Sequence, residues 1–233
     1  MGRRNTARTL LAALICAGTV ALGSVAAHAA GSTVILGAAK VAQASCPTDC
    51  LVEADVTGFQ TSIGSIRNPF VVPADGNLVA WSLKLGKPKK PDRRAFNKEF
   101  GTPTARLAVL RRVGTSTPPR YKLLRQSPAE NLGPFFGTTT TFSLTRPLPV
   151  KKDNVVALTI PSWAPALAVS QGNATKWQAS RRPTGKRGGC TDDEGRANVD
   201  AGAPQVNKGR QQPYGCSYEG ARLLYSASFV SDG

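Results

Sequence analysis

The chain has 233 residues, of which 30 are Lys or Arg and 14 are Asp or Glu, for a formal net charge of +16. A basic exported protein is drawn to polyanions such as nucleic acid, envelope polymers and membrane surfaces, although the same charge also keeps a secreted domain soluble. The one histidine, His28, lies near the N-terminus. We expect His28 to be removed with an N-terminal leader, and a mature chain without histidine would exclude Ser-His-Asp and Cys-His catalysis and histidine-ligated zinc or iron.

The first element in chain order is a predicted secretory signal peptide, residues 1–29. Three arginines within the first eight residues form a positively charged start, and an apolar run follows them. The run ends in Ala27-His28-Ala29, the small-x-small pattern that precedes a cleavage site. We expect cleavage after Ala29 or one residue later. Residues 30–233 would then form one exported domain without a transmembrane anchor, located outside the cell or in the cell envelope.

The mature sequence reads as short strands separated by turn residues. Several runs alternate apolar and polar residues, which is typical of half-buried strands, and the 23 glycines and 17 prolines are compatible with many turns. No run of ten residues shows a convincing helical period. The predicted strands lie, in chain order, within residues 32–42, 50–60, 70–72, 77–85, 105–113, 120–126, 140–150, 155–161 and 221–230.

The spacing of these runs predicts an all-β fold, a jelly-roll-like antiparallel β-sandwich with long disulfide-tied loops. Turn residues predict hairpins over residues 70–85 and 105–126. The terminal run 221–230 is expected to pair with an early strand, because the sheet needs it to close. Two stretches, 86–104 and 180–216, are rich in basic residues, proline or glycine and are expected to be irregular.

Four cysteines remain after the leader, and an even number in an exported protein argues for two disulfides. Of the three possible connectivities, we favour Cys46–Cys50 together with Cys190–Cys216, because each bond joins neighbours in sequence. A zinc site built from all four thiolates is the competing interpretation. The 25 residues between the last two cysteines do not suit a paired zinc knuckle.

Seven segments occur together in a fixed order: "SCPTDCLVEADVTGFQ", "PADGNLVAWSLKL", "ARLAVLRR", "YKLLRQSP", "VVALTIPSWAPALA", "WQASRR" and "YGCSYEGARLLYSASF". With this set, which spans nearly all of the mature chain, the sequence resembles an uncharacterised family of secreted β-sandwich proteins from high-GC, actinobacterial-type genomes. The resemblance implies export and an all-β domain of sandwich type. It carries no activity, cofactor or site residue.

The tryptophans are candidate sugar-binding residues, because flat rings stack on pyranose faces. Trp81 falls on the apolar side of its predicted strand and is expected in the core. Trp163, which two prolines bracket, and Trp177, which precedes Arg181 and Arg182, are the candidate ligand-binding platform together with those arginines. The alternative is that both rings pack at the edge of the core with their indole N–H groups bonded.

One pair of acids deserves consideration for carboxylate chemistry. Glu53 and Asp55 lie two residues apart in a predicted strand, so their side chains would share a face roughly 6.5–7 Å apart, a separation that fits an inverting glycosidase. The apolar alternation of Val52, Ala54 and Val56 favours a simpler interpretation. In that interpretation the two acids form the solvated face of an amphipathic strand.

We expect a non-enzymatic protein of the cell exterior, without a cofactor or metal, that binds a glycan or an anionic envelope polymer. Nucleic acid is the less expected partner. The alternatives are a structural or adhesion protein without a small ligand, and a carboxylate-dependent glycoside hydrolase. The basic residues that would contact a polyanion are scattered over several loops, and the main groups are Lys87, Lys89, Lys90, Arg93, Arg94, Arg111, Arg112, Lys151, Lys152, Arg181, Arg182, Lys186 and Arg187.

Overall fold

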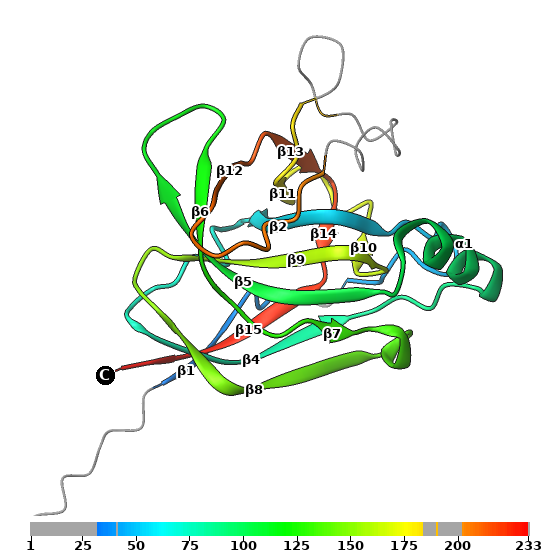
Figure 1. Ribbon diagram of the computed structural model, residues 1–233, viewed down its shortest axis with the longest axis horizontal. Coiled ribbons are helices and arrows are strands. Elements are labelled where there is room, and N and C mark those ends of the chain that lie inside the picture. The colour runs from blue at the N-terminus through cyan, green and yellow to red at the C-terminus, as the bar shows by residue number, and fades with distance from the viewer. Residues whose placement is uncertain (1–31, 41, 184–189, 191–201, 233) are drawn as a thin grey trace, which may run out of the picture. The chain divides into compact units, whose positions relative to one another are not determined.

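The computed structural model describes residues 32–40, 42–183, 190 and 202–232, and Figure 1 shows the path of the chain. The predicted signal peptide lies outside the described residues. Within them, the regular structure is mostly β-strand. It also includes one α-helix, α1 (Lys90–Phe100), and one 3-10 turn, η1 (Gly133–Phe135).

Eight strands form two sheets. The four-stranded sheet has the order β1 (Thr33–Leu36), β15 (Tyr225–Ser231), β4 (Gly76–Lys84) and β8 (Thr139–Val150). The large sheet contains, side by side, β6 (Arg120–Gln126), β5 (Thr104–Val113), β9 (Val155–Ala164) and β2 (Glu53–Ile63). All neighbours in both groups pair antiparallel.

Shorter strands extend this framework. β12 continues the large sheet beside β6, while β11 and β13 continue it beyond β2; β3 pairs with β2, β7 pairs with β5, and β10 pairs with β14 in a small separate sheet. Their bounds are β3 (Ile66–Arg67), β7 (Glu130–Asn131), β10 (Leu167–Ala168), β11 (Lys176–Ala179), β12 (Gln211–Pro213), β13 (Cys216–Glu219) and β14 (Arg222–Leu223).

The eight strands named first, four in each sheet, have the order of a jelly roll. Each connection among them carries the chain from one sheet to the other, except the β5–β6 hairpin, which stays in the large sheet. Two sheets linked by such repeated crossings are the jelly-roll form of the β-sandwich. The predicted fold class is confirmed, as are the hairpin over residues 105–126 and the pairing of the terminal strand with an early one, β1.

The main core lies between the two sheets. Strand side chains alternate between this core and the outside, so Trp81 and Leu83 of β4 meet inward-facing residues of the large sheet such as Leu107 and Leu158. All four are fully buried, and each aliphatic side chain contributes about 1.5–3 kcal/mol through its removal from water. The predicted core position of Trp81 is confirmed.

A second, smaller core lies on the opposite face of the large sheet. Gln205 contacts this sheet, because its backbone N–H donates to the Thr57 hydroxyl and its side chain donates to the Tyr121 carbonyl, both at 2.8 Å. Tyr214, which follows β12, is fully buried with its ring against Phe59 and Tyr121. The Tyr214 hydroxyl donates a 2.8 Å hydrogen bond to Gln205, which is itself buried. Residues 203–210 of the stretch 180–216 are irregular, as expected, whereas residues 211–213 form strand β12. Residues 184–189 and 191–201 of that stretch lie outside the described residues.

The predicted hairpin over residues 70–85 is wrong. Strand β4 pairs with β15 on one side and β8 on the other, which leaves no free edge for residues 70–72. Val71 instead makes an isolated bridge to Val155 of the large sheet. The segment before β4 therefore crosses between the sheets, because strand pairing in this fold is mostly non-local.

Candidate functional site

Helix α1 lies in a stretch that we expected to be irregular, so that expectation is wrong. Pro91 lies in the first helical turn, where its missing N–H is harmless. Asp92 accepts a 3.2 Å hydrogen bond from the backbone N–H of Lys89, which caps the start. Gly101 ends the helix with φ +80°, and its backbone N–H donates to the backbone carbonyl of Asn97 at 3.0 Å. None of the helical residues is fully buried.

Trp163 on β9 holds this helix against the sandwich. Its indole N–H donates to the Asn97 side-chain oxygen at 3.1 Å and to the Gly101 carbonyl at 2.9 Å. Its ring packs between Phe96 and Phe136, with centroid distances of 5.1 and 5.4 Å. Trp163 is fully buried. The structure therefore matches the alternative interpretation of Trp163, a ring packed in the core with its indole N–H bonded, and not the exposed platform.

A crevice of about 480 Å³, which we call the α1 crevice, lies between helix α1 and the segment around η1. Lys90, Arg93, Arg94 and Asn97 follow the i, i+3, i+4, i+7 spacing, so they share one face of the helix. Like charges at these spacings destabilise a helix by about 0.2–0.5 kcal/mol per pair. The crevice is lined by Lys90, Arg93, Arg94, Asn97, Thr102, Pro103, Asn131, Gly133 and Phe136.

Most polar side chains of the α1 crevice can donate hydrogen bonds, and the Thr102 hydroxyl can donate or accept. The oxygen of Asn97 is occupied by Trp163, and the oxygen of Asn131 accepts from the backbone N–H of Gly133 at 3.0 Å. Both amides therefore keep their NH₂ groups for a ligand. In the part of the chain that the structure describes, the three crevice cations form no ion pair, and the buried Nε of Arg93 has no hydrogen-bond partner. No lining residue is acidic.

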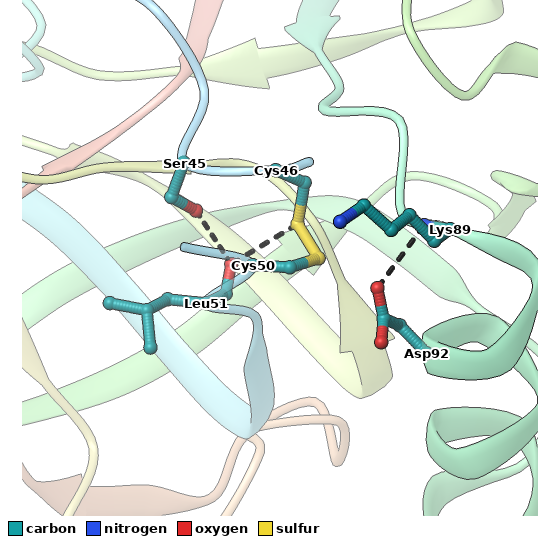
Figure 2. Close-up of a disulfide and its surroundings, with 6 residues drawn as sticks. All are labelled: Ser45, Cys46, Cys50, Leu51, Lys89 and Asp92. Atoms are coloured by element: carbon teal, nitrogen blue, oxygen red, sulfur yellow. Dashed lines mark hydrogen bonds between the residues drawn. A yellow bond between two sulfur atoms is a disulfide. The ribbon is translucent and has the colours of Figure 1, made fainter. Parts of the chain in front are cut away.

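The first disulfide supports the segment that leads into α1. Cys46 and Cys50 are bonded, as predicted, and Figure 2 shows this bond beside Lys89 and Asp92 at the start of the helix. Gly86 lies so close that an added Cβ would be 2.7 Å from the Cβ of Cys46. The tight approach of the two segments requires glycine here and links the disulfide loop to the position of α1.

Trp177 and Arg181 come together at a different place, beyond β2 on the large sheet. Trp177 is only 1% exposed and stacks on Tyr218 with a centroid distance of 4.8 Å. The Arg181 guanidinium lies 5.8 Å from the Trp177 ring and 5.6 Å from the Tyr218 ring. The expected exposed platform is wrong for Trp177 as well. Arg182 is exposed beside this cluster, which does not include Trp163.

The Arg181 charge is matched inside the protein. Its Nη2 donates to Glu53 at 2.8 Å, and both side chains are at least nine-tenths buried. Its Nη1 donates to the Tyr218 hydroxyl at 3.2 Å. Burial lowers the pKa of Arg181, but Glu53 and Tyr218 together outweigh this effect and raise it. A cavity of about 520 Å³ borders the cluster, yet its arginine is already neutralised.

Glu53 and Asp55 do not form the solvated face that the sequence predicted. The strand has a bulge between Ala54 and Val56, where Asp55 adopts φ +46° and the alternation breaks. Glu53 therefore turns inward to Arg181, while Asp55 is half-buried. Burial raises the pKa of Asp55, and the nearby Arg181 opposes this shift. The two carboxyl groups thus have different surroundings and different partners.

The second predicted disulfide, Cys190–Cys216, is also confirmed. Among the described residues, no helix is long and apolar enough to cross a membrane. No protein-family model, curated protein or solved structure matches this chain. The resemblance to a secreted actinobacterial-type family therefore stays a prediction, and the functional argument depends on the residues themselves.

Proposed function

We propose that this protein is a secreted, non-enzymatic binding module of the cell exterior that holds an anionic glycan or envelope polymer in the α1 crevice. The observation that carries the proposal is the donor set of that crevice. Lys90, Arg93 and Arg94 line the crevice together with Asn97 and Asn131, each of which keeps an NH₂ donor, and none of the lining residues is acidic.

A ligand with many acceptor oxygens suits this arrangement. Carboxylate and phosphate groups accept two parallel hydrogen bonds from one guanidinium, so Arg93 and Arg94 would fix both the position and the orientation of such a group. Phe136 adds a half-buried apolar surface on which the backbone of a polymer can pack. The relief of like-charge repulsion along α1 adds to the attraction.

The expected export supports the same proposal. Two disulfides are typical of proteins that leave the reducing cytosol, and the predicted leader over residues 1–29 would direct the chain outward. Anionic polymers are components of many cell surfaces, where a basic module gains long-range attraction to them. We place the protein outside the cell or in the cell envelope.

The test is calorimetric binding of the full mature chain to polygalacturonate and to poly(glycerol phosphate), with dextran as the uncharged control. We expect R93E/R94E to lose at least about tenfold in affinity for the charged polymer that the wild type prefers, since each charged hydrogen bond contributes about 1.5–3 kcal/mol. The matched control is R67E/R146E, which makes the same charge change at exposed arginines outside the crevice.

Three results would contradict the proposal. In the first, R67E/R146E weakens binding as much as R93E/R94E, which would mean that only net charge matters. In the second, dextran binds as tightly as the charged polymers. In the third, binding survives at 1 M salt, where screening acts within about 3 Å.

A further inference from the structure

The β5–β6 hairpin carries a second group of cations. Its register places Arg111 directly opposite Lys122, and Val113 opposite Arg120, while Arg112 lies opposite Tyr121. Arg112 therefore lies on the same face as the buried Tyr121, and the other three cations lie on the opposite face. Arg111 and Arg120 are exposed and Lys122 is half-buried. We call Arg111, Arg120 and Lys122 the hairpin cations.

Nothing acidic balances these charges within the hairpin. The sequence contains no Asp or Glu between Glu99 and Glu130. None of the hairpin cations belongs to an ion pair within the described ranges. Like charges directly opposite each other on paired strands are destabilising, so the Arg111–Lys122 register works against the stability of the hairpin unless a ligand is bound.

Strand β5 connects the hairpin cations directly to the α1 crevice. Thr102 and Pro103 line the crevice, β5 begins at the next residue, and Arg111 follows seven residues after Thr104. At the rise of an extended strand, this separation is about 24 Å. Figure 1 shows α1 near one end of β5 and the hairpin to β6 at the other.

We propose that the hairpin cations are a second contact for the polymer held in the α1 crevice, so that a chain long enough to span about 24 Å binds both sites at once. This inference rests on the proposed function, and it adds a ligand length and a second surface. Simultaneous contact makes the second binding event intramolecular, which raises the affinity for long chains without changing the affinity of the crevice.

The test compares ligands below and above the span. Digalacturonate is too short to contact both sites at once, whereas polygalacturonate is long enough to do so. The phosphate counterparts are bis(glycerol) phosphate for the short ligand and poly(glycerol phosphate) for the long one. We expect R111E/K122E to weaken binding of the long polymer by roughly tenfold or more and to leave binding of the two-unit fragment unchanged. The variant R93E/R94E should weaken both. The variant R111Q/K122Q removes the two charges without reversing them, so it should lose less affinity for the long polymer than R111E/K122E does.

The outcomes separate the two proposals. If R111E/K122E weakens long and short ligands equally, or neither, while R93E/R94E weakens both, the second contact is wrong and the crevice stands. If R93E/R94E leaves both ligands unaffected, the crevice itself is wrong. Thermal unfolding of each variant shows that the chain is folded, and R67E/R146E again controls for the change in net charge.

Discussion

Two regions of this molecule contain arginines, and they differ in whether a carboxylate balances the arginine charge. At the edge of the large sheet, Arg181 is buried and its charge is matched by Glu53 and by the Tyr218 hydroxyl. On helix α1, Arg93 and Arg94 line an open crevice with no carboxylate among its lining residues. A matched, buried cation is a structural element, whereas cations that line a crevice without a partner favour an external anion. This difference favours α1, and not Arg181, as the proposed binding region.

The largest expected effect comes from breaking the matched region. Glu53→Gln leaves the buried Arg181 charge without its carboxylate, and we expect a loss of about 3–5 kcal/mol in the free energy of unfolding. The control is Glu219→Gln, because Glu219 pairs with Lys176 at a half-exposed site and should lose no more than about 1 kcal/mol. Urea denaturation measures both. Equal losses in the two variants would contradict the structural role of Arg181.

A smaller effect is expected where the sandwich supports the unmatched region. Trp163→Phe removes the donor to Asn97 and Gly101, which should cost about 1–3 kcal/mol and lower the affinity for the charged polymer as the Asn97 amide loses its fixed orientation. Trp81→Phe is the control, since Trp81 is equally buried and its N–H has no partner among the described residues. Polymer affinity that falls equally in both variants would argue against positioning by Trp163.

The smallest expected effect is a gain in stability. Arg111→Glu places opposite charges across the β5–β6 register, because the facing residue is Lys122. We expect the free energy of unfolding to rise by about 0.2–1 kcal/mol, while binding of the long polymer weakens. The exposed variant Arg67→Glu should leave stability unchanged. A loss of stability in Arg111→Glu would show that repulsion between Arg111 and Lys122 does not destabilise the free protein.

The fold was predictable where local pattern determines it. Alternation identified the long strands, and the close spacing of Cys46 and Cys50 suggested their bond. The hairpin over residues 70–85 failed because β4 pairs with strands far away in sequence. Helix α1 was not predicted, because it buries no residue fully. Asp92 near its start and Gly101 at its end are nevertheless ordinary helix boundary signals.

The candidate site was only partly predictable, because it depends on contacts between residues that are far apart in sequence. The sequence made Trp163 a candidate platform residue, but its burial depends on helix α1 and Gly101, which supply the partners of its N–H. The inward turn of Glu53 depends on a bulge at Asp55 and on Arg181, which is 128 residues away in sequence. The amide donors of the α1 crevice depend on the hydrogen bonds that occupy the Asn97 and Asn131 oxygens, and composition does not reveal these bonds.

The most direct test is an NMR titration of the ¹⁵N-labelled mature chain with digalacturonate and with bis(glycerol) phosphate. The account predicts that the side-chain NH₂ signals of Asn97 and Asn131 and the Nε–H signals of Arg93 and Arg94 shift together, with one affinity. Signals of Arg181 and Trp177 should stay in place. Shifts centred on Arg181 and Trp177, or no shift at Asn97 and Asn131, would contradict the claim that the α1 crevice is the binding site.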